Sequence, residues 1–438
     1  MSPEAALSAR DALGVRTSCR VCESVALTPV MDLGDQCIAG AFTNPAAGRV
    51  DEPRLPLQLV RCDSSHDPGA CGLLQLRHTV SGSALYSSYW YRSGINRTMT
   101  ENLHEIARQA VDLVGGVRRG DLLVDVGCND GTLLDGYGQA DGVTLLGMDP
   151  SDVTRYAVAK GYDVVNDFFA HRALDDRYPG RKARIITSIA MFYDLEDPTA
   201  FVRDIAASLA DDGIWVSEFS YMPTMLETNS FDTICHEHLE YYSFAVIERV
   251  LATGGLEVVR AELNDVNGGS IRLFAAHAGR RARQPEDATE LERLRVREAE
   301  LGLATSEPYE AFERRVQAVR GELLALLRSL RSEGKTVHVY GASTKGNTTL
   351  QYTGIDTRLV ACAADRNPDK WGLQTIGTHI PIVSEEESRA LAPDYYLVLP
   401  WHFLAEMIER EAAFFARGGR FIVPLPEVRV IDGSGRPA

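Results

Sequence analysis

The sequence predicts an α/β protein in which a small metal-binding N-terminal domain precedes two Rossmann-like units. Two observations carry this prediction. Cysteines gather in the first 95 residues, and beyond them short apolar runs alternate with helical patterns in two separate blocks. Such alternation is typical of βαβ units and of a parallel sheet with helices on both faces. We therefore expect domains at residues 1–95, 96–280 and 281–438.

Length and charge limit the function classes that remain. At 438 residues the chain is long enough for several domains, each with its own core. The net charge of −16 repels a polyanion, which excludes broad binding to nucleic acid or to an acidic membrane. The N-terminus lacks a basic start followed by an apolar stretch, and no window approaches about 18 uncharged apolar residues. We expect a cytoplasmic protein without membrane segments, as a monomer or homodimer.

The N-terminal cysteines are spaced as metal ligands. Cys19 and Cys22 form a CxxC pair, and Cys62 and Cys71 follow, so the chain offers the four thiolates that a tetrahedral zinc site needs. Four thiolates leave no open position for water or substrate, which makes this zinc structural. His66 lies in the wide interval between Cys62 and Cys71 and is an alternative fourth ligand. The apolar runs LPLQLV and CGLLQL predict short strands in this domain.

The first α/β unit contains five strand-like runs and a closing hairpin. The turn-rich NDVNGG joins LEVVRAEL to SIRLFAAH, which predicts two antiparallel strands after the parallel ones. Together the runs predict a seven-stranded sheet. The five parallel runs are LLVDVG (122–127), TLLGMD (144–149), DVVND (163–167), RIITSI (184–189) and GIWVSEF (213–219).

A charged stretch separates the two units. Residues 281–307 predict a solvated helix or linker. Apolar residues then recur at three- and four-residue spacing, which predicts one long helix that Gly334 ends. The stripe consists of Phe312, Val316, Val319, Leu323, Leu326 and Leu330. The strand runs that follow are TVHVYGAS (336–343), RLVACAAD (358–365), DYYLVLP (394–400) and RFIVPL (420–425).

The turn VDVGCNDGTLL after the first strand is typical of a cofactor site. Its glycines allow close approach to the backbone, and the following helix start offers unpaired amide donors. A nicotinamide dinucleotide would require GxGxxG, which is absent here. An acidic turn suits the ammonium group of S-adenosylmethionine and repels a pyrophosphate. The candidate cofactor-binding residues in this turn are Asp125, Gly127, Asn129, Asp130 and Gly131.

The next two strand ends complete the expected cofactor site. Asp149, followed by Pro150, ends the second strand, where a carboxylate can accept hydrogen bonds from both ribose hydroxyls. That feature alone does not separate S-adenosylmethionine from a nicotinamide cofactor. Asn166, Asp167 and Phe168 end the third strand, where they would contact the adenine amino group and cover the ring.

The segment FDTICHEHLEYYS (231–243) concentrates residues that can move protons. It follows the fifth strand, where the carboxyl ends of parallel strands gather. An HExxH zinc protease motif fails, because Glu240 stands where the second histidine would be. A general acid or base fits better, since histidine titrates near neutrality and a neighbouring carboxylate or hydroxyl tunes it. The candidate catalytic residues are His236, Glu237, His238 and Tyr241.

The turn VYGASTKGNTTL in the second unit favours an anion. Lys345 precedes Gly346, the reverse of the P-loop order, so nucleotide hydrolysis is not expected. Small residues at a helix start, together with Ser343, Lys345 and Asn347, suit a diphosphate. Residues after later strand ends that would complete this pocket are Asp365, Lys370, Trp401 and His402.

Six motifs in this order make the chain resemble a known family. They are CRVC with the later CGLLQL, YWYRSGINRTM, VDVGCNDGTLL, DTICHEHLEYYS, NDVNGGSIR and VYGASTKGNTTLQ. The family is that of the S-adenosylmethionine-dependent C-methyltransferases, which add a branch methyl group to nucleotide-linked 4-keto deoxysugars in antibiotic pathways. The resemblance implies a zinc-binding N-terminal domain, a Rossmann-like seven-stranded methyltransferase domain and a second Rossmann-like C-terminal domain that helps hold the nucleotide sugar.

The resemblance also implies roles for individual residues. The four early cysteines would bind zinc, and His238 would be the base, assisted by Glu237. Some members have tyrosine where this chain has Cys235. The expected partner is a nucleotide-diphosphate 4-keto deoxysugar linked to TDP, flanked by Tyr89, Tyr91, Arg92 and Ser93. Candidate donors to an enolate oxygen, which remain unranked, are Tyr241, Tyr242, His236 and Asn267.

The implied chemistry begins beside the 4-ketone. Loss of the hydrogen on carbon 3 gives an enolate, and carbon 3 then takes the methyl group from the sulfonium. Two alternatives stay open: an NAD(P)-dependent sugar-nucleotide ketoreductase and a non-catalytic scaffold that binds a sugar nucleotide. The proton-moving residues of segment 231–243 argue against the scaffold.

Overall fold

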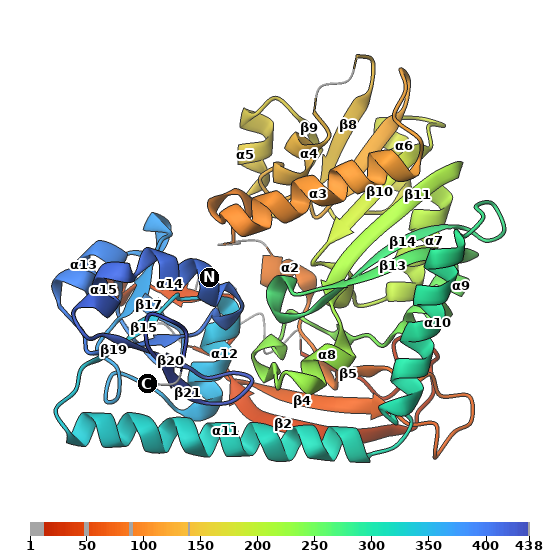
Figure 1. Cartoon of the computed structure of the whole chain (residues 1–438). Helices are drawn as coiled ribbons and strands as arrows, with labels where there is room; N and C mark the ends of the chain where they lie inside the picture. Colours follow the sequence, from red (N-terminus) through yellow and green to blue (C-terminus); the bar gives the residue numbers. More distant parts are fainter. Residues whose placement is uncertain (1–12, 48–51, 87–90, 139–140, 437–438) are drawn as a thin grey trace.

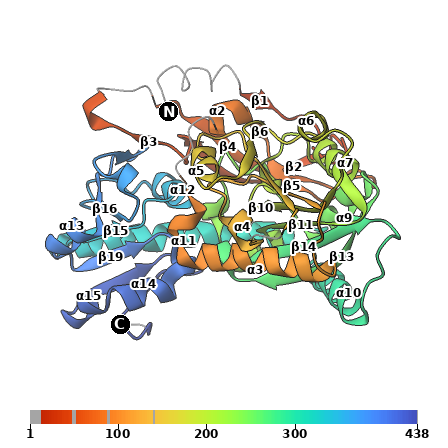
Figure 2. The same cartoon turned by 90° about the horizontal axis from the view of Figure 1, so that it is seen from above.

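Two sheets of Rossmann type and a smaller antiparallel sheet form the protein (Figure 1). The structure is a computed structural model that describes residues 13–47, 52–86, 91–138 and 141–436. In both views the C-terminal unit, drawn in blue, lies beside the seven-stranded sheet (Figures 1 and 2). The expected α/β class is confirmed.

The N-terminal domain is fastened to both larger units. Its main sheet has the order β12-β5-β4-β2, in which β2 (Leu27–Gln36), β4 (Leu55–Cys62) and β5 (Leu74–Leu76) are N-terminal. The fourth strand, β12 (Glu240–Tyr241), belongs to the histidine-rich segment. On the other side β3 (Phe42–Thr43) pairs with β17 (Gln374–Thr375) of the C-terminal unit. The remaining short elements are β1 (Gly14–Val15), β6 (His78–Thr79) and α2 (Gly82–Tyr86).

The central sheet has the order β13-β14-β11-β10-β7-β8-β9. The five strands from β7 to β11 pair in parallel, and β14 runs antiparallel to both of its neighbours. The predicted seven strands and closing hairpin are thereby confirmed. The strands are β7 (Leu122–Val126), β8 (Thr144–Met148), β9 (Asp163–Val165), β10 (Ala183–Ile189), β11 (Leu209–Ser220), β13 (Leu256–Asn264) and β14 (Ser270–His277).

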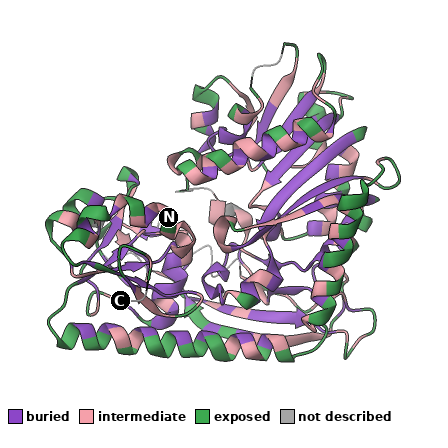
Figure 3. Ribbon diagram, in the orientation of Figure 1, coloured by how far each residue is buried: buried purple, intermediate pink, exposed green. Residues whose placement is uncertain are grey.

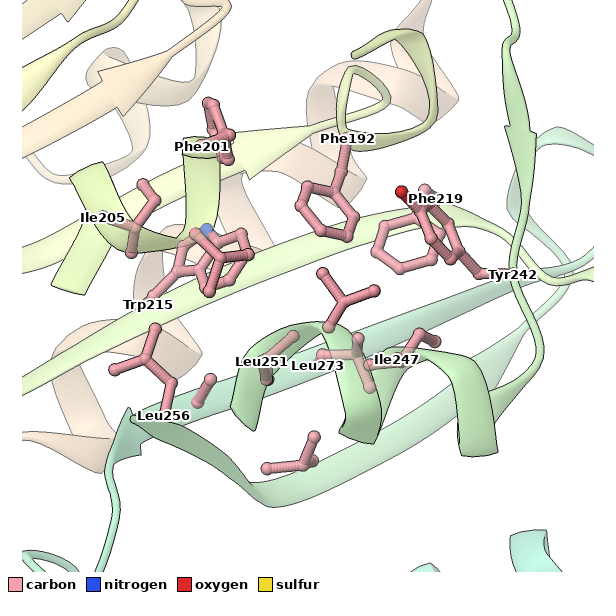
Figure 4. Close-up of a cluster of buried hydrophobic side chains, with 14 of the residues drawn as sticks. Phe192, Phe201, Ile205, Trp215, Phe219, Tyr242, Ile247, Leu251, Leu256 and Leu273 are labelled. Carbon is pink, nitrogen blue, oxygen red and sulfur yellow. The ribbon is translucent and has the colours of Figure 1, made fainter. Parts of the chain in front are cut away.

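Helices cover this sheet, and an aromatic cluster fills one interface. Phe192 lies with its ring centroid 5.3 Å from that of Trp215 and 5.1 Å from that of Tyr242 (Figure 4). Burial of one such ring stabilises the fold by about 1.5 to 3 kcal/mol. The helices are α3 (Arg97–Leu113), α4 (Thr132–Gly136), α5 (Thr154–Ala159), α6 (His171–Arg177), α7 (Pro198–Ser208), α8 (Met222–Glu227) and α9 (Phe244–Ala252).

The C-terminal sheet has the order β18-β16-β15-β19-β20-β21. Four of these strands match predicted runs, but residues 358–362 lie before the strand β16, and residues 357–359 form a turn in which the Asp356 carboxylate accepts from the Arg358 amide. The short β18 and β21 were not predicted. The elements are β15 (Val337–Tyr340), α12 (Thr344–Thr353), β16 (Ala363–Asp365), β18 (Ile382–Ser384), α13 (Glu385–Ala390), β19 (Tyr395–Val398), α14 (Leu404–Arg410), α15 (Ala412–Ala416), β20 (Arg420–Val423) and β21 (Arg429–Ile431).

Two helices connect the units, and they correct two expectations. The charged stretch is not simply solvated: in α10 (Pro285–Glu300), Leu291 and Leu294 join the core of the central sheet. In α11 (Glu307–Ser332) the buried stripe runs through Leu327, whereas Leu326 is half-buried. The outer face of α11 is exposed (Figure 3). Within the described ranges no helix has the length and apolar character to cross a membrane.

Candidate functional site

The turn after β7 has the backbone expected of a cofactor site. Gly127 and Gly131 have φ of +74° and +76°, so the turn needs glycine at both positions. The strand-end Asp149 accepts from the amide of Asn129 at 2.9 Å through Oδ2 and from that of Ser151 at 2.8 Å through Oδ1. Because each carboxylate oxygen can accept two hydrogen bonds, both can still receive a ribose hydroxyl.

A second carboxyl group lies buried just before this turn. Asp125 accepts a hydrogen bond of 2.7 Å from the Thr187 hydroxyl. Burial, with a smaller contribution from the nearby Asp149 charge, raises the pKa of Asp125 to about 7. The group therefore titrates near neutrality, and a cationic ligand would favour its ionised form.

The side chains of the turn hold a neighbouring segment. Asn129 donates to the Tyr91 carbonyl at 3.0 Å and accepts from the Ser93 amide at 3.1 Å. Asp130 accepts from the Gly94 amide at 3.0 Å. Residues 91–94 are thereby fixed against the turn, which leaves its backbone as the surface for a cofactor. Tyr89, the other candidate from this segment, lies outside the described residues.

The candidate cofactor-binding residues after β8 and β9 differ in their contacts and in their exposure. Asn166 donates its amide hydrogens to the carbonyls of Asp149 and Ser151, both at 2.8 Å, so only its Oδ1 remains to accept from an adenine amino group. Phe168 is 48% exposed, as a ring that awaits a covering ligand would be. Asp167 is exposed, and Pro150 is half-buried.

One segment after β10 joins the turn to the histidine-rich segment. A Cβ at Gly127 would lie 3.3 Å from Cγ of Met191. Two residues later, the Tyr193 ring lies 4.2 Å, centroid to centroid, from the His238 ring. The segment from Met191 to Tyr193 therefore contacts both the cofactor turn and the proposed base.

His238 is held in one tautomer. Its Nδ1 lies 2.7 Å from the Thr233 carbonyl oxygen, an acceptor, so Nδ1 carries the proton and Nε2 is left as the basic atom of the neutral ring. Burial and the Lys345 charge lower the pKa of His238 to about 3. The ring is therefore neutral, as a base must be before it takes a proton.

The other candidates of this segment do not all join His238. Glu237 is buried, accepts from the Gly40 amide at 2.8 Å through Oε1, and has no hydrogen bond from a described residue at Oε2. His236 instead places Nε2 3.2 Å from the Leu55 carbonyl of the N-terminal sheet. Tyr241 lies on β12 with a buried hydroxyl that no described residue partners. Tyr242 packs against Phe192 in the core.

The structure relocates Lys345. This residue does not line the anion pocket of the second unit, which the sequence predicted for it. Its Nζ donates to the Asn267 carbonyl at 2.7 Å, and its charge lowers the pKa of His238 and of His402. Asp232, which accepts from the Trp401 indole at 3.0 Å, faces the ammonium. Asn267, Asp232, Trp401 and His402 therefore gather around Lys345.

A separate cavity of about 180 Å³ opens at the carboxyl edge of the C-terminal sheet. It combines Tyr91 and Arg92 of the fixed segment with Ser343, Asp365 and Lys370. Asp365 accepts from the amides of Ala342 and Asn367. Ser343 caps α12 by accepting from the Gly346 amide.

Asn347 lies outside this cavity. It is buried, and its side-chain amide donates to the Ala39 carbonyl at 2.7 Å. It therefore connects the C-terminal unit to the N-terminal domain instead of lining the pocket.

The four early cysteines meet in the N-terminal domain. Their sulfur atoms all lie within 4.8 Å of one another, and the Cys19–Cys71 and Cys22–Cys62 pairs are 3.5 and 3.4 Å apart. Tetrahedral zinc with bonds of about 2.3 Å places its sulfur ligands roughly 3.8 Å apart, so the cluster fits this metal. His66 is exposed and outside the cluster, which leaves Cys71 as the fourth ligand.

Comparisons with known proteins agree with this layout. Three family profiles match: "Putative zinc binding domain" over residues 19–86, "Methyltransferase domain" over 91–261 and "C-methyltransferase C-terminal domain" over 265–426. The C-methyltransferase NovU of Streptomyces niveus is 32% identical over 418 residues, which cover 95% of this chain and 97% of that protein. The chain belongs to the C-methyltransferase family. The family resemblance expected from the motifs is confirmed.

Solved structures resemble this C-methyltransferase over about two fifths of its length. An S-adenosylmethionine-dependent methyltransferase of Clostridium acetobutylicum is 12% identical, over 41% of this chain and 92% of that chain, with a TM-score of 0.33. Magnesium protoporphyrin IX methyltransferase of Synechocystis PCC 6803 is 16% identical, over 41% and 82%, with a TM-score of 0.31. Scores this low carry no argument about substrate or mechanism.

As a C-methyltransferase, the protein is an enzyme that uses S-adenosylmethionine and carries an N-terminal zinc-binding domain. The reductase and the non-catalytic scaffold are not favoured by these matches. Sequence reasoning missed Tyr193, Thr233 and Asp232 as members of the site. Asp232 and Thr233 stand inside the quoted motif, and Tyr193 follows a strand end, so their positions were the available signal.

Proposed function

We propose that this C-methyltransferase methylates carbon 3 of a nucleotide-linked 4-keto deoxysugar, with TDP as the nucleotide, in a pathway to branched deoxysugars. The observation that carries the proposal is His238: a neutral imidazole of fixed tautomer that packs on Tyr193, two residues after the Met191 that lies against Gly127 of the cofactor turn. Methylation of carbon needs a carbanion equivalent, and a positioned base next to a ketone supplies one. Transfer to a hydroxyl or amine would need no such step.

His238, Thr233 and Glu237 have different roles in the proposed reaction. His238 Nε2 takes the proton from carbon 3, and the electron pair of that C–H bond moves into the enolate. S-adenosylmethionine supplies an electrophilic methyl group, whose bond to sulfur breaks as its bond to carbon 3 forms. The Thr233 carbonyl holds the imidazolium through Nδ1 and stabilises its charge, at a distance of 2.7 Å. Glu237 assists by orienting the segment through Gly40.

The nucleotide would occupy the C-terminal cavity. Arg92, Arg366, Lys370 and Arg410 line it together with Asp365, Glu385 and Glu406, so the lining is slightly positive within an acidic protein and suits a diphosphate. Residues 91–94, fixed to the cofactor turn by Asn129 and Asp130, would contact both ligands. In this arrangement residues 96–280 bind the cofactor, residues 281–438 bind the nucleotide, and residues 1–95 hold the two units together.

Hydrogen exchange tests the base directly. Enzyme with a TDP-linked 4-keto deoxysugar and S-adenosylhomocysteine in heavy water should exchange the carbon-3 hydrogen for deuterium, as mass spectrometry can measure. His238→Asn should slow exchange by about 10² to 10⁴, since that is the usual contribution of a general base. Glu237→Gln should cost less, because Glu237 positions the segment and takes no proton.

The matched control is His379→Asn, since that histidine is exposed on the C-terminal unit. It should exchange at the parental rate. Retained exchange in His238→Asn would transfer the role to another residue, and a product methylated on oxygen or nitrogen would exclude the enolate route.

A further inference from the structure

Lys345 has no role in the sites described so far, because it lies outside the cavity assigned to the nucleotide. It stands at the start of α12, and its side chain is partly buried. Among the described residues its Nζ makes one hydrogen bond, to the Asn267 carbonyl at 2.7 Å, although an ammonium group has three hydrogens to donate. Two donors are left. The helix α12 packs against the 231–233 turn, whose Thr233 carbonyl holds His238, so the ammonium lies near the base.

We propose that Lys345 is the catalytic electrophile of the reaction: its ammonium binds the carbonyl oxygen at carbon 4 and stabilises the enolate that His238 generates. The inference rests on the proposed function and assigns the oxyanion site. Donors that become stronger as negative charge develops are the ones that accelerate such a step.

The other candidate donors are engaged elsewhere. His236 bonds the Leu55 carbonyl, and Tyr242 packs against Phe192 in the core. Asn267 offers its backbone carbonyl to Lys345, so it positions the ammonium. Tyr241 remains with a buried hydroxyl, but it lies on β12, in the sheet of the N-terminal domain.

The charges around Lys345 suit this role. Burial lowers the pKa of Lys345, and the Asp232 carboxylate on the 231–233 turn counteracts this by favouring the ammonium form. The other titratable groups near it, Cys235, His238 and His402, are neutral. In the resting site the ammonium opposes protonation of His238. Once an enolate oxygen pairs with the ammonium, that opposition is cancelled and the imidazolium becomes favourable. Proton removal and enolate stabilisation are therefore coupled through Lys345.

The test uses the exchange assay with the full-length enzyme. Lys345→Met should slow carbon-3 exchange by about 10² to 10³ at saturating sugar nucleotide, as loss of an oxyanion donor does. Lys345→Arg should retain a larger part of the rate. Lys335→Met, an exposed lysine of the same unit, should match the parent enzyme. Lys345→Gln, which can still donate to Asn267, replaces the methionine variant if that one does not fold.

A pH profile separates chemistry from structure. Removing the ammonium should raise the pKa of His238, so the acidic limb of the exchange rate moves to higher pH in Lys345→Met but not in Lys345→Arg. Parental exchange at saturation with weaker sugar-nucleotide binding would overturn the inference and return Lys345 to a diphosphate role. No exchange in the parent enzyme would instead overturn the proposed function.

Discussion

The central and C-terminal α/β units share one arrangement, in which a glycine turn lies beside a strand-end aspartate, but the charged side chains next to it differ. In the central sheet Gly127 donates to the Met148 carbonyl at 2.8 Å, and Asp149 follows Met148. In the C-terminal sheet Gly341 donates to the Ala364 carbonyl at 2.8 Å, and Asp365 follows it. Both aspartates accept two backbone amides at 2.8 to 2.9 Å. The shared strand order, 3-2-1-4-5, places both arrangements where Rossmann-type sheets bind ligands.

The two units differ in the charges next to this arrangement. Asp125 is buried two residues before Gly127, whereas Val339 takes the corresponding place before Gly341. Lys370 lies 3.4 Å from Asp365, and no described cation is ion-paired with Asp149. A carboxyl group suits an ammonium-bearing ligand, and a lysine suits a diphosphate. The comparison indicates that the backbone determines where a ligand binds, and that a few side chains determine whether the site prefers a cationic or an anionic ligand.

The largest expected effect on ligand binding comes from Asp149→Ala. If both carboxylate oxygens hold ribose hydroxyls, the variant loses two charged hydrogen bonds, and S-adenosylmethionine should bind about 2 to 4 kcal/mol more weakly. This is a loss of about 30- to 700-fold in Kd. Titration calorimetry measures it, with Asp152→Ala, an exposed aspartate of the same loop, as the control. Sugar-nucleotide affinity should stay constant, and unchanged cofactor affinity would break the comparison.

More of the fold than of the candidate site could be predicted from the sequence. The apolar runs of β7, β8, β10 and β11 have five or more residues and glycine or aspartate at their ends, so period and turn chemistry located them, and the three-residue β9 was located by the Asn166–Asp167 turn that follows it. The strands β18 and β21 have three residues each and carry no such pattern. Motif spacing brought together the cysteines and the 236–241 segment. It could not place Lys345, because the path of a long side chain from a helix start is a tertiary property.

The two units should differ in the pH dependence of ligand binding. The pKa of Asp125 is raised to about 7, so below that pH the carboxyl is protonated and cannot pair with an ammonium. Cofactor affinity should therefore rise with pH, by up to about tenfold per unit, until it levels off near pH 7. Cofactor binding below pH 7 should release a proton, which calorimetry in two buffers of different ionisation enthalpy detects.

Asp125→Asn supplies the contrast. The amide still accepts from Thr187 but does not titrate, so cofactor affinity should be lower and independent of pH. Binding of a TDP-linked sugar should be flat over the same range in both proteins, because its doubly esterified diphosphate does not titrate near pH 7 and Val339 replaces the carboxyl there. A parallel pH dependence for the TDP-linked sugar would place the titrating group outside the cofactor turn.

The smallest effect, and the sharpest comparison, concerns Asp365. TDP carries a deoxyribose with one free hydroxyl, whereas the ribose of S-adenosylmethionine offers two, so Asp365→Ala should weaken TDP binding by about 1 kcal/mol, or about fivefold. Lys370, freed from its contact with Asp365, moderates the loss by pairing with the diphosphate. UDP, with two ribose hydroxyls, should lose more than TDP in the same variant. Asp369→Ala, an exposed neighbour with the same change of charge, should leave both affinities unchanged. Equal losses for TDP, UDP and the Asp369 control would reduce Asp365 to a long-range charge effect, and the two strand-end aspartates would then share a backbone geometry without sharing a function.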